Sequence, residues 1–150
     1  MDASNCNILY VDPVGSENKE EYLEAVWIIE EMGESPAKIS TISLKLKVAP
    51  PSTVQMLKKL EKEGYLKYIA REGVNLTLKG SVIGRRIVRN GMLIEKLMKD
   101  TLGLEIDPKV ACGIEHHMTD EFANAICTLL NHPNKCPHGN LIPKGNCCKQ

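Results

Sequence analysis

Residues 49–66 read APPSTVQMLKKLEKEGYL, and this stretch decides the fold. Proline at the first helical position presets the backbone angle and loses no hydrogen bond, so Pro51 predicts the start of a helix. Apolar residues recur inward at Val54, Leu57 and Leu60, and the helix is expected to run to Glu63 and to stop at Gly64. Its outward side is expected to carry polar and basic groups, together with one methionine: Ser52, Thr53, Gln55, Met56, Lys58, Lys59 and Lys62.

The segments on either side complete a recognisable order of elements. Upstream, residues 17–33 have the apolar spacing of an amphipathic helix, and residues 40–47 fit either a short helix or a strand. The break at 48–50 and the helix after it favour the helix. Downstream, YLKYIA (65–70) and VNLTL (74–78) are β-type runs, and Arg71-Glu72-Gly73 between them predicts a hairpin turn. Helix, turn, helix and hairpin is the order of a winged helix-turn-helix.

Charge is segregated along a chain whose formal net charge is zero. Residues 1–34 hold nine acids and one lysine, whereas residues 35–100 hold fourteen Lys and Arg and five acids. The excess of basic residues over positions 35–100 predicts a surface that binds a polyanion, although solvated helix surfaces with salt bridges give the same composition. Gln can pair with adenine, Ser and Thr bond bases or phosphates, and Lys neutralises phosphate. The expected DNA-contacting residues are Lys38, Lys47, Pro51, Ser52, Thr53, Gln55, Lys58, Lys59 and Arg71.

The second half of the chain is expected to be helical. A long helix begins at about Thr77, another at Asp107-Pro108, and Thr119 caps a third. The third helix has an apolar stripe that suits a second small domain or a dimer interface, formed by Phe122, Ala125, Ile126, Leu129 and Leu130. We therefore predict a DNA-binding domain over residues 1–78, and a metal-binding and dimerisation domain over residues 79–150 that ends in a Cys-rich tail without regular structure.

One face of the helix after Pro108 is expected to hold metal donors. Cys112, Glu115 and His116 stand at positions i, i+3 and i+4, so a thiolate, a carboxylate and an imidazole lie together. Glu21 and Glu24 on the first helix offer carboxylates from a second element. Two other interpretations remain open: Cys112 as a small core residue beside two surface polar groups, or Cys112 as a nucleophile activated by His116.

A second cluster of soft ligands lies near the C-terminus. Cys136, His138, Cys147 and Cys148 fall in a segment rich in Gly and Pro that cannot pack alone, which suits a structural Zn²⁺ ion. A reducible thiol cluster and a flexible tail are the alternatives. Cys6 and Cys127 are expected to be structural.

Length and composition exclude several classes of protein. With 150 residues, 43% of them hydrophobic, the chain is too apolar for a disordered protein and too short for a barrel enzyme. It has no apolar run of about 20 residues, and its start lacks a secretory pattern. We therefore expect a cytoplasmic protein whose six cysteines are thiols or metal ligands. No nucleotide-binding loop or hydrolase motif suggests an enzyme.

Four motifs in order, APPSTVQMLKKLEKEGYL, LTLKG, GIEHHMTDE and PHGNLIP, resemble the diphtheria-toxin-repressor family of iron- and manganese-dependent transcriptional repressors. The resemblance runs from about Glu20 to Pro143. It implies a mostly α fold with a small β-hairpin wing, in which an N-terminal winged helix-turn-helix is followed by a helical dimerisation domain. This chain is too short for the SH3-like domain that long members add.

The resemblance also implies a function. It places a regulatory metal site at Glu21, Cys112, Glu115 and His116, and describes a homodimer that binds operator DNA when the site is filled. Glu21 looks like the manganese branch and Cys112 like the iron branch. Because thiolate favours Fe²⁺ over Mn²⁺, we expect Fe²⁺ as the co-repressor, with Mn²⁺ as the alternative. Gly91 and Pro108 stand where relatives have histidines of a second site, so that site is expected to be weakened or absent.

Two rival functions follow from the same residues. A winged-helix regulator could sense oxidation through Cys112 or the Cys147-Cys148 pair, in which case it would respond to reductant and ignore a chelator. A protein that buffers metal or holds structural zinc would have no nucleic-acid partner at all.

Overall fold

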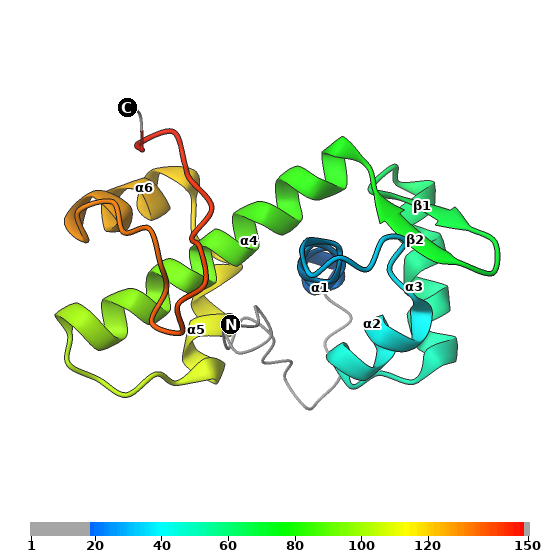
Figure 1. Ribbon diagram of the computed structural model, residues 1–150, viewed down its shortest axis with the longest axis horizontal. Coiled ribbons are helices and arrows are strands. Elements are labelled where there is room, and N and C mark those ends of the chain that lie inside the picture. The colour runs from blue at the N-terminus through cyan, green and yellow to red at the C-terminus, as the bar shows by residue number, and fades with distance from the viewer. Residues whose placement is uncertain (1–18, 149–150) are drawn as a thin grey trace. The chain divides into compact units, whose positions relative to one another are not determined.

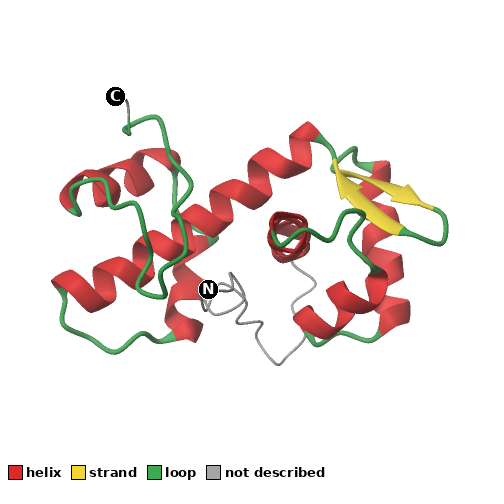
Figure 2. Ribbon diagram, viewed as in Figure 1, coloured by secondary structure: helices red, strands yellow, loops and turns green. Residues whose placement is uncertain are grey.

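The computed structural model describes residues 19–148, which form two compact units, residues 19–85 and 86–148. The boundary falls inside helix α4 (Leu78–Lys96). Helices dominate both units, and β1 (Leu66–Ile69) pairs with β2 (Gly73–Leu76) in the only sheet of the described residues (Figures 1 and 2). The expected mostly α fold with a hairpin wing is confirmed. Cys6 lies outside the described residues.

The first unit is built on three helices. They are α1 (Lys19–Glu31), α2 (Ile39–Leu46) and α3 (Pro50–Lys62). Prolines occupy the first two positions of α3, so this helix starts one residue before Pro51. Gly64 follows it with φ +83°, a backbone conformation that ends helices and suits glycine. The helices enclose a core that includes Tyr22, Leu23, Val26, Ile42, Leu57 and Leu60.

The hairpin that follows α3 is the wing. Strands β1 (Leu66–Ile69) and β2 (Gly73–Leu76) pair in antiparallel register, with Leu66 opposite Leu76. Backbone hydrogen bonds of 2.9 Å in both directions join Ala37 to Val74, so the chain before α2 lies along the outer side of β2. The left-handed turn position belongs to Arg71 (φ 67°), and Gly73 is the first residue of β2 rather than part of the turn.

The outward face of α3 differs from the expectation at two positions. Thr53 is fully buried, and Met56 is 8% exposed. The Thr53 hydroxyl lies 2.9 Å from the Ser43 hydroxyl of α2 and 3.3 Å from the carbonyl oxygen of Ala49. A threonine that satisfies its hydroxyl inside the protein packs as a core residue, so the prediction that Thr53 faces outward to contact DNA was wrong in orientation.

The second unit begins within α4 and has capped helices. A π-helical turn, η3 (Leu97–Thr101), follows α4, and then come α5 (Pro108–Glu115) and α6 (Asp120–Leu129). The Asp107 side chain accepts hydrogen bonds from the amides of Lys109 and Val110, and the Thr119 hydroxyl accepts one from Phe122. At the start of α4, Thr77 accepts one from Gly80. The expected caps Thr77 and Thr119 are confirmed, and the helix expected to start at Asp107-Pro108 is capped by Asp107.

The predicted apolar stripe of α6 is buried only in part in this chain. Ala123, Ile126 and Cys127 face the interior, whereas Phe122 is 51% exposed and Leu129 is 68% exposed. Much of the predicted stripe is therefore an apolar face open to solvent in this chain. None of the helices among residues 19–148 has the length and apolar character needed to cross a bilayer.

Candidate functional site

Helix α3 of the first unit presents polar and basic side chains on its exposed side. Eight of the nine residues predicted to contact DNA are exposed, all except Thr53. Ser52, Gln55 and Lys59 line a shallow hollow of about 100 Å³ whose other walls are Tyr22 and Met56. The N-terminal half of α3 therefore offers a hydrogen-bonding face with a cation beside it, which is the chemistry that reads base edges and holds phosphate.

Metal donors lie along α5 of the second unit. Glu115 ends this helix and is 1% exposed, and His116 is its C-cap. Nε2 of His116 lies 3.4 Å from Oε1 of Glu115. Cys112 is half-buried one turn earlier on the same helix. The helix is regular over this stretch, so the spacing i, i+3, i+4 places the three side chains on one face.

Helix α4 fixes the position of Glu115. The Asn90 side-chain amide donates a hydrogen bond of 3.1 Å to the backbone carbonyl of Glu115. A Cβ atom on Gly91 would collide with Oε2 of the same residue, so the missing side chain leaves the space that the carboxylate fills. Gly91 thus makes room for a predicted metal ligand.

The electrostatics favour a neutral imidazole. Burial lowers the pKa of His116 to about 4, and the nearby positive charges of His117 and Arg86 act in the same direction. At neutral pH the His116 ring therefore keeps a lone pair free of a proton, the state in which histidine binds a metal.

The carboxylates expected from the first helix belong to the other unit. Glu21 and Glu24 lie on α1 and are 6% and 3% exposed. A site that combines Glu21 with Cys112, Glu115 and His116 therefore draws ligands from both units, and it stays a prediction.

The cysteines near the C-terminus are grouped differently from the expectation. Sγ of Cys147 and Sγ of Cys148 lie near Cys127 and His132, with the four donor atoms within 4.8 Å of one another. Among residues 19–148, no such group of three or more donors includes Cys136 or His138. Cys136 is instead buried in a tight loop, and Nδ1 of His138 lies 3.4 Å from Oε2 of Glu95. The predicted zinc ligands Cys136 and His138 are therefore replaced by Cys127 and His132, which group with Cys147 and Cys148.

Sequence reasoning missed Cys127 and His132 as members of this cluster. Cys127 was expected to be structural because it lies on the apolar face of a helix. The available signal was a cysteine and a histidine five residues apart that flank a helix end, upstream of an adjacent Cys pair. Spacing of this kind does not match a common zinc motif, so it gives little warning.

The thiols in this cluster differ in acidity. Burial and hydrogen bonds to Cys148 and Cys147 raise the pKa of Cys127 to about 12. Burial also opposes ionisation of Cys148, but hydrogen bonds involving the Gly145 backbone, His132 and the neighbouring thiols outweigh it and lower its pKa to about 6. Of the Cys127 and Cys148 thiols, Cys148 therefore ionises more readily.

A winged helix-turn-helix followed by a helical unit with buried metal donors defines a class of DNA-binding regulators. The chain matches two family models: residues 16–74 match the iron-dependent repressor N-terminal DNA-binding domain, and residues 77–144 match the iron-dependent repressor metal-binding and dimerisation domain. The chain belongs to the iron-dependent repressor family, which confirms the resemblance carried by its motifs. The diphtheria toxin repressor is among its relatives.

Relatives match most of this chain. The iron-dependent repressor IdeR of Mycobacterium leprae is 31% identical over 127 residues, which cover 83% of this chain and 54% of IdeR. The regulator MntR of Shouchella clausii is 38% identical over 116 residues, covering 75% of this chain and 79% of MntR. The structure of the manganese regulator SloR aligns with a TM-score of 0.75 at 31% identity, covering 87% of this chain and 61% of SloR. The chain thus spans about half the length of IdeR.

Proposed function

We propose that this protein is a cytoplasmic, metal-dependent transcriptional repressor, not an enzyme, that binds operator DNA as a homodimer when Fe²⁺ fills a site formed by Glu21, Cys112, Glu115 and His116. Residues 1–78 read DNA, and residues 79–150 bind metal and dimerise. The observation that carries the proposal is the placement of Glu115. Its carboxylate is almost fully buried, fits into the space left by Gly91 and lies beside the neutral His116 ring. A buried carboxylate beside an imidazole suits a cation.

The DNA-binding part of the proposal is supported by the surface of the first unit. Gln55 and Ser52 are exposed at the N-terminal half of α3, with Lys58 and Lys59 on the same helix. Arg71 at the tip of the wing is exposed as well. Gln55 would read a base edge, and the cations would bind phosphates and set the register of the protein on the duplex.

Metal dependence follows from where the four ligands lie along the chain. Glu21 comes from the DNA-reading unit, and the other three come from α5 and its cap. A bound divalent cation supplies the positive charge that lets two carboxylates, a thiolate and an imidazole share one site. When the four side chains meet, the reading unit is tied to the dimerising unit. The two α3 helices of a dimer can then hold a separation near one DNA turn, about 34 Å or a multiple of it.

The ligand types support Fe²⁺ as the co-repressor. Cys112 offers a thiolate, and thiolates favour Fe²⁺ and the later divalent ions over Mn²⁺. Relatives named for iron and for manganese both match this chain, so Mn²⁺ is the alternative.

Homodimer formation is supported by apolar side chains in the second unit. Val110 and Ile114 on α5 are 45% and 37% exposed, and Phe122 and Leu129 on α6 are exposed further. Exposed apolar surface of this kind marks sites of protein association. The family model that matches this part of the chain is described as a dimerisation domain.

The test is a titration of DNA binding against metal. Anaerobically purified protein is mixed with a labelled duplex from the promoter of its own transcription unit, and fluorescence anisotropy is followed as Fe²⁺, Mn²⁺ or Zn²⁺ is added. The proposal predicts tight binding only with metal, reversed by a chelator and unaffected by reductant. Reversal by reductant alone would support a thiol-sensing regulator instead. To shift the ratio of DNA-competent to incompetent protein from 1:99 to 99:1, the metal must bind the competent state more tightly than the other state by about 5.5 kcal/mol.

A further inference from the structure

We propose that Cys127, His132, Cys147 and Cys148 bind one Zn²⁺ ion that anchors the C-terminal segment to helix α6. This site lies within residues 86–148 and shares no residue with the proposed regulatory site. Its role would be structural, so it goes beyond the proposed function.

The separations of the donor atoms fit a single tetrahedral ion. With Zn–S near 2.3 Å and Zn–N near 2.05 Å, two sulfurs should lie about 3.8 Å apart, and a sulfur and a nitrogen about 3.6 Å apart. Sγ of Cys127 lies 3.5 Å from Sγ of Cys148 and 3.5 Å from Nδ1 of His132. Sγ of Cys148 lies 3.8 Å from Sγ of Cys147 and 3.8 Å from the same nitrogen. Four edges of the tetrahedron therefore have the expected lengths to within about 0.3 Å.

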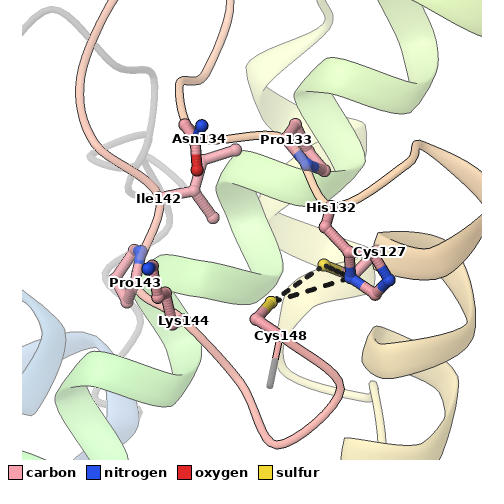
Figure 3. A pocket seen from close by; sticks show the side chains of 8 residues that line it. All are labelled: Cys127, His132, Pro133, Asn134, Ile142, Pro143, Lys144 and Cys148. Atoms are coloured by element: carbon pink, nitrogen blue, oxygen red, sulfur yellow. Dashed lines mark hydrogen bonds between the residues drawn. The ribbon is translucent and has the colours of Figure 1, made fainter. Parts of the chain in front are cut away.

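Backbone geometry at the end of α6 brings the first two ligands together. Asn131 and His132 adopt positive φ angles of 63° and 51°, which are uncommon for residues other than glycine. The chain therefore folds back at this point, and the amide of His132 donates a hydrogen bond of 2.8 Å to the carbonyl of Cys127. Figure 3 shows His132, Cys127 and Cys148 directed toward one another.

A buried arginine balances the charge of the cluster. Three thiolates, one neutral imidazole and Zn²⁺ leave a net charge of −1. Arg89 is 6% exposed, and its Nη2 lies 3.3 Å from Sγ of Cys147 and 3.0 Å from Oδ1 of Asn124. Gly145 gives it room, because a Cβ atom there would collide with the guanidinium group. A cation aimed at a sulfur is a typical partner around a thiolate metal site.

The segment that supplies Cys147 and Cys148 has no regular secondary structure. Residues 142–148 contain no helix or strand, and they border a cavity of about 260 Å³ lined by Cys127, His132, Pro133, Asn134, Ile142, Pro143, Lys144 and Cys148 (Figure 3). The three cysteines are free thiols and not a disulfide. A metal cross-link between α6 and this segment would stabilise a region that has no helix or strand of its own.

The experiment measures zinc bound to the full chain. Protein purified under reducing conditions is loaded with Zn²⁺, dialysed against a moderate chelator and analysed by mass spectrometry for metal content. The regulatory ligands are first disabled by His116→Ala, so that this background reports the second site alone. We expect about one zinc per chain to remain. Co²⁺ in place of Zn²⁺ should give thiolate charge-transfer bands and the intense visible bands of tetrahedral coordination.

Variants of the ligands decide the outcome. Cys148→Ser and His132→Ala, each in the same background, should lower retained zinc at least tenfold and remove the cobalt bands, whereas Cys136→Ser should retain both. Cys148 lies in a segment without helix or strand, so its replacement tests the site even if His132→Ala fails to fold. Any of three results would overturn the proposal. Cys148→Ser could retain all of its zinc, or Cys136→Ser could lose its zinc. The protein could also contain a disulfide and bind no zinc after that disulfide is reduced. DNA binding by the otherwise unmodified protein is measured separately, so failure of the repressor function and failure of this site can be told apart.

Discussion

Gly91 of α4 and Glu115 of α5 are packed so closely that a side chain at position 91 would occupy the place of Oε2 of Glu115. The two helices therefore position a buried carboxylate through the absence of a single atom. Since Glu115 is a proposed metal ligand, this packing relationship should control metal affinity.

We expect Gly91→Ala to weaken Fe²⁺ binding about tenfold or more, because the added methyl group displaces the carboxylate. The clash is with the end of a flexible side chain, so the fold should persist. Calorimetric titration under anaerobic conditions measures the affinity. The matched control is Gly113→Ala on α5, where a Cβ atom meets nothing within 4 Å. Equal affinity in the two variants would contradict the role given to Glu115.

Thr53 should affect stability and not DNA recognition. Thr53→Val removes the hydroxyl that bonds Ser43 and leaves a buried partner unsatisfied, so the free energy of unfolding should fall by about 1–3 kcal/mol. The base preference of the folded protein should not change. Urea unfolding and binding to a panel of duplex variants provide the two measurements. A changed base preference with unchanged stability would mean that Thr53 contacts DNA after all.

Gln55 and Lys59 should have distinct effects on DNA binding. Replacement of Gln55 by Ala should cost about 1–3 kcal/mol on the preferred sequence and relax the preference at one base pair. Lys59→Ala should weaken binding to all sequences and lower the salt dependence, the slope of log K against log salt, by about one unit. Lys99→Ala, an exposed lysine of the other unit, is the control and should change neither quantity.

Glu63 should contribute a pH-dependent part of the stability. A hydrogen bond from Lys19, with Nζ at 2.6 Å and 2.8 Å from the two carboxylate oxygens, lowers the pKa of Glu63 below 4.5. The stabilisation is therefore fully present above pH 4.5 and is lost as the pH falls through the lowered value. In urea unfolding, the difference between the wild type and Glu63→Gln should shrink below pH 4.5. The exposed Glu72→Gln variant should show no such trend, and a difference that is constant or grows at low pH would refute this account.

Local rules predicted most of the fold. Helix starts at Pro50-Pro51, Thr77, Asp107 and Thr119 have chemical signals that need no tertiary context, because the cap satisfies the first amides of the helix itself. The wing was also predictable, since two β-type runs flank a short polar turn. Which side of a helix faces inward is a tertiary property. Thr53 was assigned to the wrong side because its burial depends on partners elsewhere in the chain.

The two candidate sites also differ in how far local sequence patterns predict them. The spacing of Cys112, Glu115 and His116 within one helix was readable from sequence. In the structure Nε2 of His116 lies 3.4 Å from Oε1 of Glu115, and the role of these residues as metal ligands stays a prediction. The thiol cluster was not readable from sequence, because Cys147 and Cys148 meet residues 15–21 positions earlier only after the chain reverses at Asn131 and His132. Proximity in the sequence favoured Cys136 and His138, whereas the reversal selects Cys127 and His132.

The most direct test is the affinity of the protein for its own promoter with and without Fe²⁺, measured under anaerobic conditions for the wild type, Cys112→Ala and His117→Ala. His117 is exposed beside the proposed ligand His116, so it is the matched control. We predict that Fe²⁺ raises the DNA affinity of the wild type and of His117→Ala by at least a hundredfold and leaves Cys112→Ala at its metal-free level. If Cys112→Ala responds to Fe²⁺ as the wild type does, the proposed metal site is wrong.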